Sequence, residues 1–208
     1  GTDQQVSWTR PHIMGVLNAT PDSFSDGGQF LELSDAIAQA KLLISQGATI
    51  IDIGGESTRP GADRVALETE QARVIPIVEA LLEAGWFRQS GALISVDTMN
   101  SATAAAALAA GADLINDVSG GLADPAMHSA VAGNDGLYVL SHWRGFSDGM
   151  DQLNTYLDLA AEVAAELKLR IDAAVDSNTP NAASRWQAPA KALRQWVLPE
   201  FQMRTYII

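Results

Sequence analysis

The sequence predicts an α/β protein with a parallel sheet of the (β/α)8 (TIM) barrel type, in which about five βα units are recognisable. Three segments share one pattern, where Gly-Ala precedes a short apolar run that reaches an Asp: residues 47–53, 91–97 and 111–117. Each Gly falls where a helix would end in a residue with positive φ, and each apolar run is typical of a strand buried on both faces. Helical patterns separate these strands, and such alternation over short links indicates a parallel sheet.

The same alternation continues through most of the chain. Strands are expected at residues 12–17, 49–53, 93–96, 114–115 and 137–140. Helices are expected at residues 34–46, 67–84, 101–110, 125–131 and about 153–175. Ser34 is the expected N-cap of the first helix, because apolar residues follow it at helical spacing and a Ser side chain accepts hydrogen bonds from the first turn.

Polar residues close the predicted strands, and their distribution decides between two architectures. A doubly wound sheet gathers its site at one or two strands, whereas a barrel collects side chains from many strands at one rim. At or next to the strand ends lie Asn18, Asp52, Asp97, Asn116 with Asp117, and His142. This distribution favours the barrel.

Composition limits the classes of partner. The 208 residues are 47% hydrophobic and carry 13 basic against 25 acidic residues, a net charge of −12, which argues against nucleic acid or an anionic membrane surface. Without cysteine there are neither disulfides nor thiolate metal sites, which is compatible with a reducing compartment. No apolar run approaches the roughly 18 residues of a membrane span, so a cytoplasmic protein is expected.

The chain changes character after about Asp176, so we divide it into a partial barrel domain, residues 1–176, and an atypical C-terminal tail, residues 177–208. The tail is basic, with Arg185, Lys191, Arg194 and Arg204 against Glu200 alone. It is either a C-terminal helix with an extension or a region where the coding frame departs from that of the ancestral chain.

Two loops that follow strands carry candidates for anion and metal binding. Asn18 and Asp22, in the segment IMGVLNATPDSFSDGG (residues 13–28), offer hard oxygen ligands suited to Mg²⁺ and to a phosphate that the metal bridges. Thr58 and Arg59, in GGESTRPGADR (residues 54–64), offer donors, and the planar guanidinium fits a phosphate or carboxylate. The alternatives are an ordinary Pro-Asp turn and a solvent loop with an incidental Arg.

Asp97, Asn116 and Asp117 are candidates for binding a flat heterocycle. A carboxylate accepts from an aminopyrimidine N–H pair, and an amide both donates and accepts. Capping of the following helices is the alternative for Asp97 and Asp117. His142, in LSHWRG, has either a substrate-binding or a structural role, and the sequence holds no zinc-binding HExxH, GxSxG, P-loop or GxGxxG pattern.

These motifs, in this order from about Ile13 to His142, resemble those of the dihydropteroate synthase family of pterin-binding TIM-barrel enzymes. The resemblance implies a transferase of folate biosynthesis that joins 6-hydroxymethyl-7,8-dihydropterin diphosphate to p-aminobenzoate and releases pyrophosphate with Mg²⁺. It makes residues 1–176 a partial pterin-binding domain. Sulfonamides, as mimics of p-aminobenzoate, are expected to compete.

The resemblance also implies roles for individual residues. Asn18 matches the metal and pyrophosphate residue, and Asp22 lies in the first loop. Thr58 and Arg59 match the loop that closes over pyrophosphate and p-aminobenzoate. Asp97 and Asn116 match contacts to the pterin edge, and with Arg59 they form the expected catalytic set.

The chain also departs from the family pattern. Ser141-His142 stands where Met-His is common, and the later DPGxGF strand, SRK and Arg-x-His elements are not found. An unclosed barrel with an exposed parallel edge is expected, and with it self-association, such as a homodimer. The alternative functions are a non-catalytic or truncated relative that only binds pterin or diphosphate, and a pterin-binding methyltransferase domain, which the ESTRPG loop disfavours.

Overall fold

The described part of the protein contains one parallel β-sheet whose strands follow each other in chain order. The computed structural model describes residues 12–19, 29–56, 64–134, 136–146, 153 and 155–177, and the side chains of the first helix from residue 33 onward. Within these residues the strands are β1 (Met14–Asn18), β2 (Ile50–Gly54), β3 (Leu93–Asp97), β4 (Leu114–Asp117) and β5 (Leu137–Leu140). They pair in the order β1-β2-β3-β4-β5, all parallel. A doubly wound sheet reverses its order at a switch point, so the uninterrupted order confirms the barrel type.

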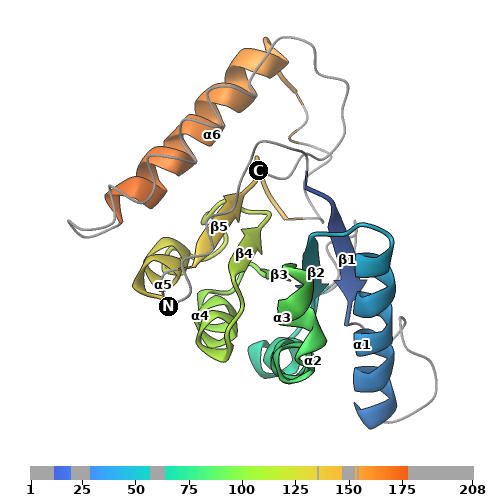
Figure 1. Ribbon diagram of the computed structural model, residues 1–208. Coiled ribbons are helices and arrows are strands. Elements are labelled where there is room, and N and C mark those ends of the chain that lie inside the picture. Colours follow the sequence, from blue (N-terminus) through green and yellow to red (C-terminus); the bar gives the residue numbers. More distant parts are fainter. Residues whose placement is uncertain are drawn as a thin grey trace.

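At least one helix follows each strand along the chain, and each helix contacts at least one other helix (Figure 1). Their bounds are α1 (Gln29–Ser45), α2 (Leu67–Glu83), α3 (Trp86–Ser90), α4 (Ser101–Ala110), α5 (Met127–Gly133) and α6 (Leu159–Asp176). Among the described residues, none of these helices is both long and apolar enough to cross a membrane.

The predicted elements are confirmed, with shifts at their ends. The expectation that Ser34 caps the first helix is wrong: α1 begins at Gln29, so Ser34 lies inside it. The last helix begins later than predicted, because Asp158 is its N-cap and accepts a hydrogen bond from the Ala161 N–H at 3.0 Å. The short helix α3 was not predicted.

Glycine closes the helices before three strands, as the repeated Gly-Ala pattern predicts. Gly47, Gly91 and Gly111 have φ of 104°, 73° and 107°. This left-handed conformation is strained for residues with a side chain, which explains why Gly stands at each position.

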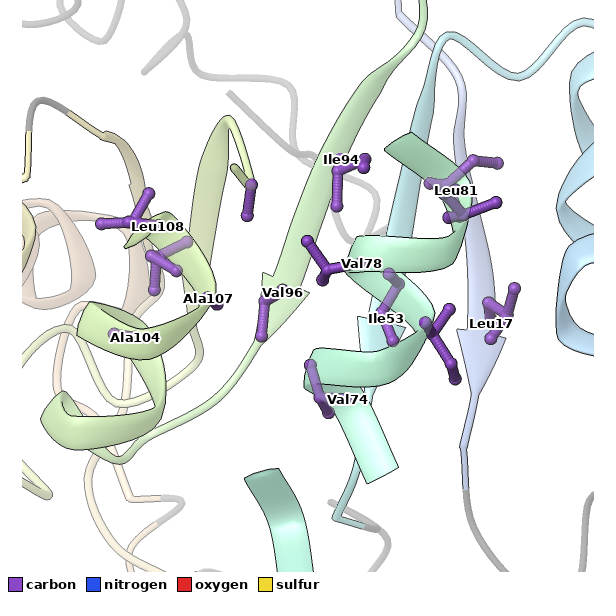
Figure 2. Close-up of a cluster of buried hydrophobic side chains, with 14 of the residues drawn as sticks. Leu17, Ile53, Val74, Val78, Leu81, Ile94, Val96, Ala104, Ala107 and Leu108 are labelled. Atoms are coloured by element: carbon purple, nitrogen blue, oxygen red, sulfur yellow. The ribbon is translucent and has the colours of Figure 1, made fainter. Parts of the chain in front are cut away.

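The core lies between the sheet and its helices (Figure 2). Val74, Val78 and Leu81 of α2 lie one or two helical turns apart and point at the strands, where Ile53 and Ile94 receive them. All five side chains are buried to at least 99% of their surface. The outward-facing residues of each strand are thus fixed by apolar packing, and their alternate neighbours must point to the other face of the sheet.

Candidate active site

The register of the strands aligns the predicted site residues in a row across the sheet. Asn18 of β1 pairs with Gly54 of β2, Gly54 with Asp97 of β3, and Asp97 with Asn116 of β4. All four positions lie at the carboxyl ends of parallel strands. Paired residues point to the same face, so the side chains of Asn18, Asp97 and Asn116 converge on one rim, which we call the mouth row (Asn18, Gly54, Asp97, Asn116).

Gly54 leaves space between two members of the mouth row. A Cβ at this position would lie 3.8 Å from Asp97 Oδ2 and 3.9 Å from Asn18 Oδ1, both ordinary contact distances. The two side-chain oxygens therefore flank a gap that a larger residue would fill. The gap gives a ligand access to both oxygens.

Asn116 is held by a carboxylate beneath it. Its Nδ2 donates to Asp52 Oδ2 at 3.0 Å, and Ser95 Oγ donates to Asp52 Oδ1 at 2.5 Å. In the described part of the chain Asn116 Oδ1 makes no hydrogen bond, so the amide is oriented with its acceptor available. Burial raises the pKa of Asp52 above its ordinary value, although the two hydrogen bonds oppose that rise.

Asp97 is a half-buried carboxyl with no hydrogen bond among the described residues. Burial, and after it the negative charges of Asp52, Asp117, Glu70 and Glu56, raise the pKa of Asp97 from the ordinary 3.8 to about 8. A small pocket beside it is lined by Glu56, Glu70, Asp97, Thr98 and Met99. A ligand that donates N–H groups would supply the hydrogen bonds that the Asp97 carboxylate lacks.

Asp117 lies on the opposite face from Asn116, because side chains alternate along a strand. It is fully buried and accepts hydrogen bonds from the N–H groups of Ser119 and Gly121, the Ser119 hydroxyl and the Tyr138 hydroxyl at 2.7–2.8 Å. Of the two roles left open for Asp117, the structural one is supported. It stabilises the turn after β4 rather than a following helix.

His142 lies two residues beyond β5 and contacts α6. Its Nε2 is 2.7 Å from Glu166 Oε2, and the Arg144 guanidinium also donates to Glu166 and to Glu162 at 2.6–3.2 Å. Arg144 further stacks over the Tyr156 ring at 3.9 Å from its centroid. These contacts fasten α6 to the end of β5, and substrate binding by His142 stays a prediction.

Three candidates, Asp22, Thr58 and Arg59, lie outside the described residues, as does the tail from residue 178, so the boundary after Asp176 also stays a prediction. Among the described residues there is no group of three His, Cys, Asp or Glu that could hold a metal ion. Asp52 was not singled out as a site residue, although its place two residues before Gly54 puts it on the face of the mouth row. That spacing was the available signal.

The chain is similar to known proteins in sequence and in fold. Residues 14–182 match the family of pterin binding enzymes. A dihydropteroate synthase from Synechocystis sp. is 44% identical over 165 residues, which are 79% of this chain and 55% of that protein. The chain therefore spans about half the length of this curated relative.

Solved structures of dihydropteroate synthases are similar to this chain as well. Xanthomonas albilineans dihydropteroate synthase with 4-aminobenzoic acid has a TM-score of 0.71 and 42% identity, over 83% of this chain and 59% of that chain. The Burkholderia cenocepacia enzyme complexed with 7,8-dihydropteroate has a TM-score of 0.66 and 39% identity, over 84% of this chain and 57% of that one. The chain therefore belongs to the pterin-binding enzyme family, alongside the dihydropteroate synthases.

Proposed function

We propose that the protein catalyses the dihydropteroate synthase reaction, in which p-aminobenzoate replaces the diphosphate of 6-hydroxymethyl-7,8-dihydropterin diphosphate. The observation that carries the proposal is the mouth row, where the Asp97 carboxyl and the Asn116 amide oxygen point to one rim without hydrogen-bond partners in the described part of the chain. The similarity to enzymes solved with 4-aminobenzoic acid and with 7,8-dihydropteroate supports the choice of substrates.

Asp97 and Asn116 would bind the pterin. A pterin presents an amino group and a ring N–H along one edge of a flat heterocycle, and both are donors. The Asp97 carboxylate accepts a pair of such donors, and Asn116 Oδ1, oriented by Asp52, accepts another. A ligand N–H pair favours the ionised form of Asp97, so binding would reverse the rise of its pKa.

Asn18 would lie at the diphosphate end of the site. It is exposed at the end of β1, and its Oδ1 lies across the Gly54 gap from Asp97. One amide oxygen fits Mg²⁺, which commonly takes one or two protein oxygens together with substrate phosphates and water. When bound, Mg²⁺ neutralises charge on the departing diphosphate. We propose that Asp22, Thr58 and Arg59 also act at the diphosphate end of the site.

The reaction needs little proton transfer before the substitution. The bond between the pterin methylene carbon and the diphosphate oxygen breaks, the arylamine nitrogen bonds to that carbon, and the nitrogen then releases one proton. Positive charge that develops on the pterin as the bond breaks would be stabilised by the Asp97 carboxylate. Catalysis then depends on positioning and electrostatic stabilisation.

The test is pyrophosphate release from the 208-residue protein with both substrates, with and without Mg²⁺. We expect release that depends on Mg²⁺ and on p-aminobenzoate, and that falls at least about 100-fold in Asn18→Ala and Arg59→Ala, the loss typical of removing one charge-stabilising group. Asp35→Asn, an exposed change on α1, is the control and should retain activity. A folded protein that binds the pterin but releases no pyrophosphate would contradict the catalytic proposal.

That outcome would instead support the second candidate, a relative that only binds pterin or diphosphate. A homodimer and a cytoplasmic location also stay proposals. Sedimentation analysis would test the first and localisation of the tagged protein the second.

A further inference from the structure

A carboxylate that the proposed reaction does not use lies next to the mouth row. Glu70 occupies the first turn of α2 and is 1% exposed, although acidic residues in a first helical turn usually face water. Its side chain reaches the turn between β3 and α4, which follows Asp97 directly. Burying a carboxylate is costly unless hydrogen bonds replace its water, so its environment must supply them.

Two side chains from that turn and one from the start of α4 donate to Glu70. Thr98 Oγ1 donates to Oε1 at 2.6 Å, while Asn100 Nδ2 and Thr103 Oγ1 donate to Oε2 at 2.7 and 2.6 Å. Thr98 Oγ1 also accepts from the Asn100 N–H at 3.0 Å, which fixes the direction in which the hydroxyl donates. Both oxygens of Glu70 thus hold one short segment of chain.

Thr98 transmits this restraint to Asp97. Its side chain is held by Glu70, and its N–H donates to the Asn116 carbonyl at 3.1 Å, so the residue is fixed on both sides. Asp97 precedes it and has no side-chain hydrogen bond in the described residues. The direction of the Asp97 carboxyl therefore depends on its backbone, and the backbone depends on Thr98.

The hydrogen-bond network around Glu70 also reaches Glu56 and Arg64, which lie at the two ends of the loop after β2. Arg64 Nη2 donates to Asn100 Oδ1 at 3.1 Å, and Arg64 Nε lies 2.7 Å from Glu56 Oε1. Gly55 packs against Glu70 so closely that a Cβ there would lie 3.2 Å from Glu70 Cγ. Glu70 is thus the centre of a polar network between two strand ends.

We propose that Glu70 is a positioning residue for Asp97, holding the turn after β3 through Thr98 so that the Asp97 carboxyl faces the pterin edge at the mouth. This role rests on the proposed function, since it is defined by the ligand that Asp97 would bind. In the described residues the Glu70 carboxylate makes its hydrogen bonds to Thr98, Asn100 and Thr103 and none to the mouth row.

The negative charges around Glu70 and Asp97 allow a second test of the proposal, which is the pKa of Asp97. The negative charges of Asp52, Asp117, Glu70 and Glu56 each raise the pKa of Asp97; Asp52 lies on the face of the mouth row, whereas Asp117 lies on the opposite face of the sheet. Arg64 contacts Glu56, and Arg73 of α2 donates to the Gly55 carbonyl at 2.7 Å, so both cations engage other partners. Glu70→Gln removes one of the four negative charges without changing the shape of the side chain. The pKa of Asp97 should then fall.

Two buried threonines supply a pair of variants that each lose a hydrogen bond to Glu70, and Thr98→Val also removes the acceptor of the Asn100 N–H. Thr98→Val and Thr103→Val each remove one hydroxyl that donates to Glu70 at 2.6 Å, from side chains that are 3% and 0% exposed. Only Thr98 adjoins Asp97. Thr103→Val therefore reports the structural cost of a lost bond to Glu70, and Glu79→Gln, an exposed change on the same helix, is the control for the charge.

The experiment measures two quantities on the full chain. The first is the titration midpoint of the Asp97 carboxyl by ¹³C NMR without ligand, and the second is the affinity for 6-hydroxymethyl-7,8-dihydropterin. We expect Glu70→Gln to lower the midpoint, and Thr98→Val to weaken the affinity about tenfold, as for one lost hydrogen bond to a charged group. Thr103→Val and Glu79→Gln should leave both quantities close to wild type.

Equal losses of affinity in Thr98→Val and Thr103→Val would overturn the proposal, because they would show a merely structural role. An unchanged Asp97 midpoint in Glu70→Gln would overturn it as well, and this titration needs no ligand. If the wild-type protein fails to bind the pterin, the proposed function fails and the positioning role falls with it, while the titration still shows whether Glu70 and Asp97 are coupled.

Discussion

Replacing Asp97 by Asn is expected to make the ligand-free protein more stable than wild type at neutral pH, with the advantage disappearing near pH 4. The pKa of Asp97 is raised to about 8 by burial and by neighbouring carboxylates. An acid with a raised pKa in the folded state holds its proton more tightly there than in the unfolded chain. Its contribution to stability is greatest at low pH and is lost as the pH rises from the ordinary value toward 8.

The magnitude follows from the two pKa values. The ordinary value is 3.8 and the folded value is about 8, so Asp97 stays protonated in the folded protein while it ionises in the unfolded chain. Between pH 4 and pH 7 the linkage relation gives a loss of about 4 kcal/mol. Relaxation and water around a half-buried group recover part of this, so we expect a measured difference of about 2–4 kcal/mol. The Asn side chain does not titrate, so the Asp97→Asn protein lacks this pH-dependent loss of stability.

The assay is urea unfolding of wild type and Asp97→Asn at several pH values from about 4 to 8, compared as a difference at each pH. Contributions of titrating groups that lie far from Asp97 cancel in that difference, because they are common to both proteins. Asp35→Asn should follow wild type throughout. Curves for Asp97→Asn and wild type that stay parallel within about 1 kcal/mol would refute the argument that the mouth row holds an uncompensated carboxyl.

Three further predictions concern the glycines, the turn after β4 and the inhibitors. Gly54→Ala should fold normally but weaken binding of the dihydropterin by at least about tenfold, because its methyl group enters the gap beside Asp97. Gly55→Ala should instead lower the stability of the protein by about 1–3 kcal/mol in thermal unfolding, because its Cβ would lie 2.8 Å from Val74 Cγ2. Tyr138→Phe should cost about 1–2 kcal/mol by removing the 2.7 Å hydrogen bond to Asp117, with unchanged pterin affinity in calorimetry. Sulfonamides should inhibit pyrophosphate release competitively with p-aminobenzoate, and a pattern insensitive to p-aminobenzoate concentration would contradict a shared pocket.

The sequence predicts the fold well because its signals are local and repeated. Gly47, Gly91 and Gly111 each adopt the positive φ that the Gly-Ala pattern requires, and the apolar runs after them are strands. The start of α1 was misplaced because helical residues precede Ser34, so its capping preference gives way to the continuing helix. The helix α3 is too short to show a periodic pattern.

The sequence predicts the site less completely than the fold. Whether a polar residue belongs to the site depends on which face of the sheet its side chain occupies, and this is set by tertiary structure. Asn116 and Asp117 are adjacent in the strand and point to opposite faces, and only the pairing of Asn116 with Asp97 shows which of the two faces the mouth. Asp52 is recognisable as a polar residue near a strand end, but not as the partner of Asn116, and Glu70 looks like a solvated first-turn acid. Both are buried by tertiary contacts that no local pattern encodes.

The central claim is that the mouth row binds the pterin edge, and a crystal structure of the 208-residue protein with 7,8-dihydropteroate tests it most directly. We expect pterin nitrogens within about 3 Å of the Asp97 carboxylate and of Asn116 Oδ1, with Asn116 Nδ2 still donating to Asp52. A pterin bound away from these two side chains, or an Asn116 amide turned from Asp52, would contradict the account.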